Sequence, residues 1–536
     1  MRKLDNKLGS SLKENNLQNN VLKLIQGPVL ILTVIGIIGL LIRIYYFPYE
    51  IPLTHDSLLY FWYSIDLGIT GDLPTATGRE MYQFPNNGWP IFLSMFFSVF
   101  ESDNYLAFMD LQRYVTLSIS VITIIPVYLL CRRFFNKTLS LVGPAIYVFH
   151  PLITSNSLLG TTEPLFILLV TLSLYLFLST NHKVIILSFI VLALLSTVRY
   201  EGMILFIPFS VLFILRHRKE HNFIFRYLLL AGIFILILLP VAYIRSETIG
   251  TDGLISNVLS GSGYFAASIT SNSVLSDDGS GKEPLALGFT NLLKFFGIVS
   301  LPYLLFLTPY GFFKIFKEKN YLNYTLIAIG ITAILPAFYA YSRDFQETRY
   351  LLVLIPILSI VSVFGIQKIT ELTKKYKIIL VTIFLLILFS SYIYLDNQKI
   401  DYNYERNAFD FAKIVYEKTD IINGYHPEDA YLRPVIGEFS ETFPKMKKLM
   451  PKSITIIQTK NFSSVTEFID LYRDENLQYI VVDDKKDRPE FLQKIYADEK
   501  KFPYLNNVFD SNSNGYDYNV KLFFIDYEKY DEFNSP

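Results

Sequence analysis

Residues 28–47 read PVLILTVIGIIGLLIRIYYF, and Arg43 is the only charged residue among them. A bilayer core about 30 Å thick is crossed by a helix of about 20 apolar residues, so this run predicts a membrane-spanning helix. Similar runs recur along the 536-residue chain, which is 51% hydrophobic with a mean hydropathy of +0.34. Only helices and closed barrels satisfy their backbone groups in lipid, and these runs have the length of helices. We therefore predict a mainly α-helical, polytopic membrane protein.

The apolar runs predict about eleven spans, of which the third, fifth and sixth are short: 28–47, 109–131, 138–153, 163–180, 184–198, 201–216, 226–244, 291–313, 321–341, 350–367 and 377–395. Lys and Arg gather in alternate connections, such as 132–137, 216–226 and 368–377, and in the tail 1–27. Because short cytoplasmic loops carry the positive charge, we expect a cytoplasmic amino terminus and an external carboxy terminus. No cleavable signal is apparent before the first span, which we interpret as a signal anchor.

Charge and composition disfavour several classes of function. Lys plus Arg equal Asp plus Glu, 48 each, and the division into basic and acidic loops is topological, so we do not expect nucleic acid as a partner. Cys131 is the only cysteine, which excludes an internal disulfide and a thiolate metal site. The six histidines are scattered without the spacing of zinc ligands, so we expect no structural metal.

The first external segment, residues 48–108, contains two apolar runs of about eleven residues, 57–67 and 90–100. Each is too short to cross a bilayer, so we expect two helices that lie in the membrane interface. Both tryptophans of the chain, Trp62 and Trp89, belong to this segment. They are either interfacial anchors, where Trp is enriched, or platforms that stack against a sugar or a lipid headgroup.

Two further segments interrupt the bundle predicted over 28–395. Residues 245–290 are rich in Gly, Ser and Asn, so we expect part of this loop to be mobile. The loop either closes over a bound substrate or is an insertion that the fold tolerates. Asp277 and Asp278 within it either bind a cation or are merely solvated. Residues 396–536 predict strands at 453–458 and 478–482 around a helix that a capping box opens at Ser464, which favours a small external α/β accessory domain.

Asp56 is predicted to lie at the boundary between lipid and water, where an enzyme that acts on a lipid-linked substrate would need a general base. Asp56, with His55 beside it, follows the first span by about ten residues and precedes the interfacial helix. We interpret Asp56 as a general base and His55 as a substrate contact. Asp is also a favoured helix N-cap residue, which stabilises a helix by about 1 kcal/mol. An N-cap role alone would explain an aspartate at position 56.

Other charged residues gather at external ends of predicted helices. Glu163 opens a span, where a carboxylate is costly unless it is paired or faces a polar cavity. Arg343 and Arg349 stand at the external ends of the ninth and tenth spans, and either they bind a phosphate at a helix terminus or they pair with Asp344 or Glu347. Arg199 and Glu201, in the turn between two short spans, either pair with each other or contact substrate. Arg43 is a weaker candidate, because its side chain could reach the headgroups.

The order of these features resembles the GT-C superfamily of membrane glycosyltransferases, and most closely the group of protein O-mannosyltransferases and aminoarabinose transferases. The resemblance covers about residues 28–395. It is carried by these stretches: Thr54-His-Asp56-Ser, Phe84-Pro-Asn-Asn-Gly-Trp-Pro90, Thr162-Glu163-Pro-Leu-Phe, Arg199-Tyr-Glu-Gly202 and Glu347-Thr-Arg349-Tyr350-Leu-Leu. Asp56 is followed by Ser57 rather than by the second acid that several branches of the superfamily carry, and no tryptophan follows Trp89, which disfavours transfer of a whole oligosaccharide to asparagine.

The resemblance implies an enzyme that moves one sugar, with inversion, from a polyprenyl-phosphate donor to a hydroxyl of a protein, lipid or glycan on the external face. It implies Asp56 and Glu163 as catalytic residues and Arg199, Arg343, Arg349 and Tyr350 around the donor phosphate. His55, Trp62, Trp89 and Glu201 are expected to contact substrate; a divalent cation such as Mg²⁺ or Mn²⁺ is left open. The alternatives are a transporter or flippase, although no internal repeat is visible, and a membrane scaffold.

Overall fold

The computed structural model describes residues 27–535 except 70–86, 103, 251, 271–283, 374–375, 400–401, 419–420, 424–454, 458, 460–461, 487 and 517–518. The predicted tail 1–27, apart from Gly27, and the pair Asp277–Asp278 lie outside the described residues. The chain divides into two compact units. The first comprises Met1–Phe47, Arg79–Trp89 and Arg113–Lys399, and the second comprises Pro48–Gly78, Pro90–Gln112 and Ile400–Pro536.

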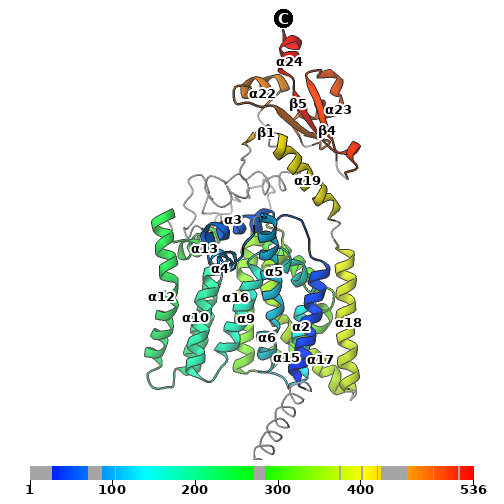
Figure 1. Ribbon diagram of the computed structural model, residues 1–536. Coiled ribbons are helices and arrows are strands. Elements are labelled where there is room, and N and C mark those ends of the chain that lie inside the picture. The colour runs from blue at the N-terminus through cyan, green and yellow to red at the C-terminus, as the bar shows by residue number, and fades with distance from the viewer. Residues whose placement is uncertain are drawn as a thin grey trace, which may run out of the picture. The chain divides into compact units, whose positions relative to one another are not determined.

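The first unit is a helical bundle, whose long helices run roughly parallel to one another in Figure 1. Its helices, in chain order, are α2 (Pro28–Tyr45), the later part of α5 (Tyr105–Ile122), α6 (Ile124–Cys131), η2 (Leu139–Leu141), α7 (Val142–Val148), α8 (Pro151–Ser157), α9 (Glu163–Phe177), α10 (His182–Val198), α11 (Gly202–His217), α12 (Phe223–Ile249), α13 (Ile255–Thr270), α14 (Pro284–Val299), α15 (Leu304–Lys317), α16 (Tyr321–Ser342), η3 (Thr348–Leu354), α17 (Ile355–Thr373) and α18 (Tyr376–Asn397). Helix α13 occupies part of the segment in which we expected a mobile loop.

Six stretches of helix among the described residues are long and apolar enough to cross a membrane: Pro28–Tyr45, Tyr105–Cys131, Phe223–Glu247, Tyr321–Ser342, Thr348–Thr373 and Tyr376–Asn397. A bent pair of helices would provide a seventh crossing. The other predicted spans coincide with shorter apolar helices: Leu139–Val148, Glu163–Phe177, His182–Val198 and Gly202–His217. The chain is therefore a mainly helical membrane protein, as predicted.

The span predicted over 291–313 differs from the expectation. It consists of two helices, α14 and α15, whose axes are bent by 110°. Pro302 lies in the break between them, and a proline has no N–H to continue a helical hydrogen-bond ladder. The Tyr303 hydroxyl in the same break donates a hydrogen bond of 2.8 Å to the carbonyl of Ile146.

Helices α15 and α17 pack backbone against backbone at two glycines. A Cβ atom on Gly311 would collide with the carbonyl oxygen of Val361, and one on Gly365 would lie 2.5 Å from the carbonyl oxygen of Leu307. Small residues allow such close approach in lipid, where helices associate by packing and not by excluding water. The two glycines therefore set the distance between these helices.

Arg43 does not reach toward headgroups, which corrects the expectation for this residue. Its side chain is fully buried. It donates hydrogen bonds to the hydroxyls of Ser157 (3.0 Å) and Ser120 (3.0 Å) and to the carbonyls of Gly39 (2.9 Å) and Val148 (3.1 Å). A buried guanidinium is tolerated when its donors are satisfied, so Arg43 ties α2 to the neighbouring helices.

The second unit contains α3 (His55–Ile69), most of α4 (Gly88–Phe97), the start of α5 and the carboxy-terminal domain. The elements of that domain are α19 (Asn403–Lys418), β1 (Ile421–Asn423), β2 (Thr455–Ile457), α22 (Val465–Tyr472), β3 (Tyr479–Asp483), α23 (Glu490–Ala497), η4 (Glu499–Lys501), β4 (Leu505–Asp510), η5 (Asn512–Asn514), β5 (Val520–Ile525) and α24 (Tyr527–Asn534). Strands β3, β5 and β4 form an antiparallel sheet in that order, and β1 pairs with β2 in parallel.

Alternate residues of the central strands enter two different cores. Ile480 and Val482 of β3 join a cluster that includes Phe468 of α22 and Phe491 of α23. Val481, between them, faces the opposite cluster, which contains Phe409 and other residues of α19. Because side chains alternate along a strand, helices cover both faces of the sheet.

The strand-helix-strand prediction for this domain is confirmed in its elements but not in its pairing. The Ser464 hydroxyl accepts a hydrogen bond from the Glu467 N–H at 3.1 Å, so the predicted cap is present, while the Glu467 carboxylate reaches back to Ser463. Among the described residues, however, β2 pairs with β1, whereas β3 pairs with β5. The alternation of apolar and polar residues predicts that a segment is a strand, but it does not predict which strand pairs with it. Long-range packing decides the pairing.

Candidate active site

A tight turn between α10 and α11 presents two of the predicted site residues. The turn is closed by a hydrogen bond of 2.9 Å from the Gly202 N–H to the Arg199 carbonyl. A Cβ on Gly202 would collide with the Leu195 side chain and lie 3.1 Å from the backbone of Ser196. Glycine at this position therefore lets α11 begin close against the end of α10, and Arg199 and Glu201 emerge side by side.

Arg199 lies between two carboxylates. Its Nη1 is 2.7 Å from Oε1 of Glu163, and its Nη2 is 2.7 Å from Oε1 of Glu201. Nη1 is also 3.3 Å from the hydroxyl of Thr162. The Glu163 side chain is 4% exposed, that of Glu201 14% and that of Arg199 17%, so this is a largely buried ion cluster. The Arg199–Glu201 pair expected from the sequence is present, and Glu163 joins it.

Each carboxylate keeps a second oxygen that the guanidinium does not engage. Oε2 of Glu163 and Oε2 of Glu201 are buried, and neither has a hydrogen-bond partner among the described residues. Such atoms are costly inside a protein, and they are expected where a ligand supplies the missing partner. One arginine between two acids also leaves this cluster with a formal charge of minus one.

The cluster borders a pocket with an empty volume of about 490 Å³, which includes its open mouth. Three other elements contribute to the wall: the amino-terminal part of α9, the middle of α16, and η3. The lining residues are Glu163, Phe166, Ile167, Arg199, Glu201, Leu205, Thr332, Ala333, Pro336, Arg349, Tyr350 and Val353. Five of the residues proposed from the sequence therefore meet at one cavity, whereas the residues from α16 were not foreseen.

Arg349 contributes a second cation to the pocket. Its guanidinium carbon lies 5.6 Å from the centre of the Tyr350 ring, and its side chain is 27% exposed. It also forms an ion pair with Glu347, as one reading of the sequence expected. Arg343, by contrast, is exposed and stacks on the rings of Tyr339 and Phe345 at 5.8 and 5.5 Å, and it is not one of the residues that line this pocket.

Tyr200, which was not among the site residues proposed from the sequence, lies in the turn between Arg199 and Glu201. Burial, and then the negative charge of Glu201, raises the pKa of Tyr200 to about 12. Its hydroxyl therefore stays protonated at neutral pH and can donate a hydrogen bond. The only signal in the sequence was its position between two charged residues.

The remaining predicted site residues lie in or beside the first external segment. Asp56 is in the first turn of α3, whose first residue is His55, and its side chain is half-buried. Because α3 begins at His55 and not at Ser57, Asp56 lies inside the helix and is not its N-cap. Trp62 and Trp89 are 1% and 0% exposed, so both indole rings are packed inside the protein.

Among the described residues, one group of side chains has the geometry of a metal site, and it is not in this pocket. It consists of His182, His217 and Glu220, which lie at the opposite ends of α10 and α11 from Arg199 and Glu201. No metal ligands were expected among the histidines, because the six histidines lack the short spacings along the chain that are typical of zinc ligands. These residues come together only because the two helices are antiparallel.

Comparison with known proteins gives a match to a family model over part of the chain and a similarity of fold. Residues 90–244 match the model of the family described as Dolichyl-phosphate-mannose-protein mannosyltransferase. The structure is similar to ArnT from Cupriavidus metallidurans bound to undecaprenyl phosphate, with a TM-score of 0.53 and 12% identity, over 92% of this chain and 97% of that one. No curated protein matches the chain by sequence.

The structure is also similar to the apo form of the oligosaccharyltransferase from Archaeoglobus fulgidus, with a TM-score of 0.52 and 11% identity, over 90% of this chain and 73% of that one. Identities this low support a statement about the fold alone. Together with the family match, they confirm the resemblance to the GT-C superfamily that the sequence indicated.

Proposed function

We propose that this chain, a membrane glycosyltransferase of the GT-C superfamily, moves one sugar from a polyprenyl-phosphate donor to a hydroxyl group on the external face of the membrane. One observation carries the proposal: Arg199 is held between Glu163 and Glu201 at a pocket that Arg349 and Tyr350 also line. The cavity thus has an anionic cluster in one part of its wall and, in another part, the cation of Arg349, whose partner Glu347 is 49% exposed.

These two parts of the wall match the charges that develop during sugar transfer. The sugar acquires positive, oxocarbenium-like character while negative charge collects on the departing phosphate. The second oxygens of Glu163 and Glu201 are placed to stabilise the positive charge, because no described residue satisfies them. Preoriented charges in a partly buried site act strongly on a transition state.

The phosphate is assigned to Arg349 and the hydroxyl of Tyr350. Arg199 already gives one nitrogen to each of two carboxylates, so its charge is largely neutralised. We therefore revise its role from phosphate ligand to a residue that positions Glu163 and Glu201. Arg349 lies in the first turn of η3, beside Tyr350, and both residues line the pocket.

Asp56 is proposed as the base that removes the proton from the acceptor hydroxyl. The assignment rests on its place at the start of α3 and on the family resemblance. A phosphate leaves already stabilised, so one carboxylate base suffices where a hydrolase needs an acid as well. Attack by the acceptor on the face opposite the phosphate inverts the configuration of the sugar.

The donor class is supported by the similarity to a protein whose structure contains undecaprenyl phosphate. Apolar side chains in the wall, among them Phe166, Ile167 and Leu205, provide a surface for the start of a prenyl chain. If the reaction uses a divalent cation, the pocket offers it the carboxylates of Glu163 and Glu201 as oxygen ligands. The distribution of Lys and Arg supports a cytoplasmic amino terminus and an external carboxy-terminal domain.

The test is a turnover assay with a panel of polyprenyl-phosphate sugars. Purified wild type and Asp56→Asn are incubated with each donor, and sugar release is followed by mass spectrometry. Loss of a general base lowers turnover by about 10²- to 10⁴-fold, so we expect that decrease for Asp56→Asn with donor binding retained. Equal turnover in both proteins would remove Asp56 from the mechanism. Absence of turnover with every donor would favour a transporter.

A further inference from the structure

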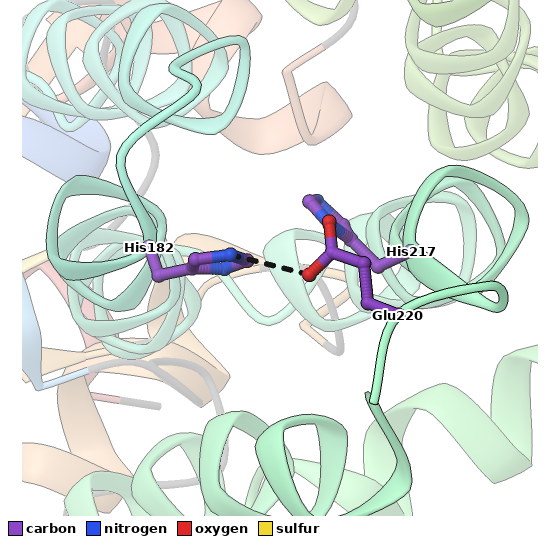
Figure 2. A group of neighbouring side chains, drawn as sticks. All are labelled: His182, His217 and Glu220. Carbon is purple, nitrogen blue, oxygen red and sulfur yellow. Dashed lines mark hydrogen bonds and ion pairs between the residues drawn. The ribbon is translucent and has the colours of Figure 1, made fainter. Parts of the chain in front are cut away.

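Two helices bring three potential metal ligands together at the end away from the pocket. His182 is the first residue of α10, His217 is the last residue of α11, and Glu220 follows in the turn before α12. Figure 2 shows the His182 ring and the Glu220 carboxylate pointing toward each other, with His217 beside them. A ring nitrogen of each histidine and a carboxylate oxygen all lie within 4.8 Å of one another.

The separations are close to those of a tetrahedral zinc site. Bonds of about 2.0–2.2 Å at tetrahedral angles place neighbouring ligand atoms roughly 3.3 Å apart. Nδ1 of His217 is 2.7 Å from Oε1 of Glu220, and Nε2 of His182 is 3.3 Å from Oε2 of the same carboxylate. The two distances run to different oxygens of Glu220, so a small rotation of the carboxylate is needed for one oxygen to face both rings, whose centres are 5.1 Å apart.

One ring nitrogen in this group is buried without a partner. His217 is 4% exposed, and its Nε2 has no hydrogen-bond partner among the described residues. Nδ1 faces the Glu220 carboxylate. The tautomer that carries its proton on Nε2 offers the lone pair of Nδ1 to a cation. Two imidazoles and one carboxylate form a ligand set typical of zinc and its transition-metal neighbours.

We propose that His182, His217 and Glu220 bind one Zn²⁺ ion, with water in the fourth position, and that the ion links the ends of α10 and α11. The site is independent of the proposed sugar transfer. The same two helices carry Arg199 and Glu201 at their other ends, so a link here restricts the movement of the pair that builds the pocket.

Arg226 competes with the metal for the same atoms. Its Nη1 is 2.6 Å from Oε2 of Glu220 and 2.9 Å from Nε2 of His182. The guanidinium therefore occupies the place of a cation, and zinc must displace it. Its side chain is 41% exposed and can turn into solvent. Lys183, Arg216, Arg218 and Lys219 are also close in the chain, so the local positive charge lowers the affinity for zinc.

The experiment titrates ZnCl₂ into chelator-treated, full-length protein in detergent, in competition with a chromogenic chelator. We expect one tight site per chain in wild type. Glu220→Gln, which keeps the shape of the side chain, and His182→Gln should each lower the affinity for zinc by about 100-fold. Loss of an outer-shell partner lowers metal affinity by roughly 10- to 100-fold, and loss of a direct ligand should have at least the larger effect. His221→Gln, at an exposed histidine in the same turn, is the matched control and should bind zinc as wild type does.

Two further measurements separate this site from other zinc binding. Arg226→Gln should raise the affinity about tenfold, because a competing cation is removed. Zinc should raise the unfolding temperature of wild type and of His221→Gln but not that of Glu220→Gln, because a ligand stabilises only the folded state that binds it. Equal zinc binding by wild type and the His182→Gln/Glu220→Gln double variant would overturn the proposal, as would the lack of a stoichiometric site in wild type.

Discussion

Replacing Arg199 by glutamine should destabilise the bundle far more than the loss of a surface ion pair would. The substitution leaves the carboxylates of Glu163 and Glu201 without their shared cation, although their side chains are only 4% and 14% exposed. Removing one partner of a buried ion pair costs about 3–5 kcal/mol, whereas an exposed pair contributes about 0–1 kcal/mol. Since Arg199 itself is 17% exposed, we expect about 3 kcal/mol.

A second substitution gives this prediction its sharpest form. In the wild-type background, Glu163→Gln removes one charge-assisted hydrogen bond and should cost about 1.5–3 kcal/mol. In the Arg199→Gln background, the same change removes one of two buried, unpaired charges, so it should stabilise the protein. The sign of the Glu163→Gln effect therefore reverses between backgrounds, which a set of independent surface contacts cannot produce.

The free energy of unfolding is measured in mixed micelles of a mild detergent and dodecyl sulfate, with helix content followed by circular dichroism. Arg343→Gln is the control, because Arg343 is exposed and outside the pocket lining; its change should stay within about 0.5 kcal/mol. A loss below about 1 kcal/mol for Arg199→Gln, or a Glu163→Gln effect of the same sign in both backgrounds, would refute the buried cluster.

Two other predictions use matched pairs. Arg349→Gln should lower kcat/KM about 10- to 100-fold, equivalent to a lost charged hydrogen bond of about 1.5–3 kcal/mol. Arg343→Gln should change kcat/KM little. Equal effects of the two substitutions in the turnover assay would contradict the phosphate role of Arg349. Gly311→Ala places a Cβ against a backbone carbonyl of α17 and should destabilise the bundle by about 1–3 kcal/mol. Gly330→Ala, in α16, should be neutral or stabilising, because a Cβ atom at Gly330 would meet no other atom within 4 Å. If the two alanine variants have the same stability in the unfolding assay, the contact at Gly311 does not set the packing of α15 and α17.

Local features of the sequence were predicted well because their causes are local. An apolar run of sufficient length must be helical in lipid, and nearly every predicted span has a helix in the structure. The cap at Ser464 was predictable for the same reason, since its hydrogen bond joins residues three apart. Glu163 and Arg199 were singled out because a charge at the end of an apolar helix is costly without a partner.

The partners of these residues could not be predicted from the sequence. Thr332, Ala333 and Pro336 belong to an ordinary apolar helix, and only the packing of α16 makes them part of the pocket wall. The approach of His182 to His217 likewise depends on the antiparallel arrangement of α10 and α11. Neither relation corresponds to a spacing along the chain.

The amino-acid sequence by itself determined that the protein is helical, that it belongs to a membrane, and which charged residues stand at the ends of its helices. Tertiary structure alone decided that Arg199 binds both Glu163 and Glu201, that Arg349 shares their pocket, and that the predicted eighth span bends by 110°. The physical reason is the distance along the chain over which the interactions act. Burial of apolar side chains and capping act over a few residues, whereas a site is made by contacts between helices that are far apart in the chain.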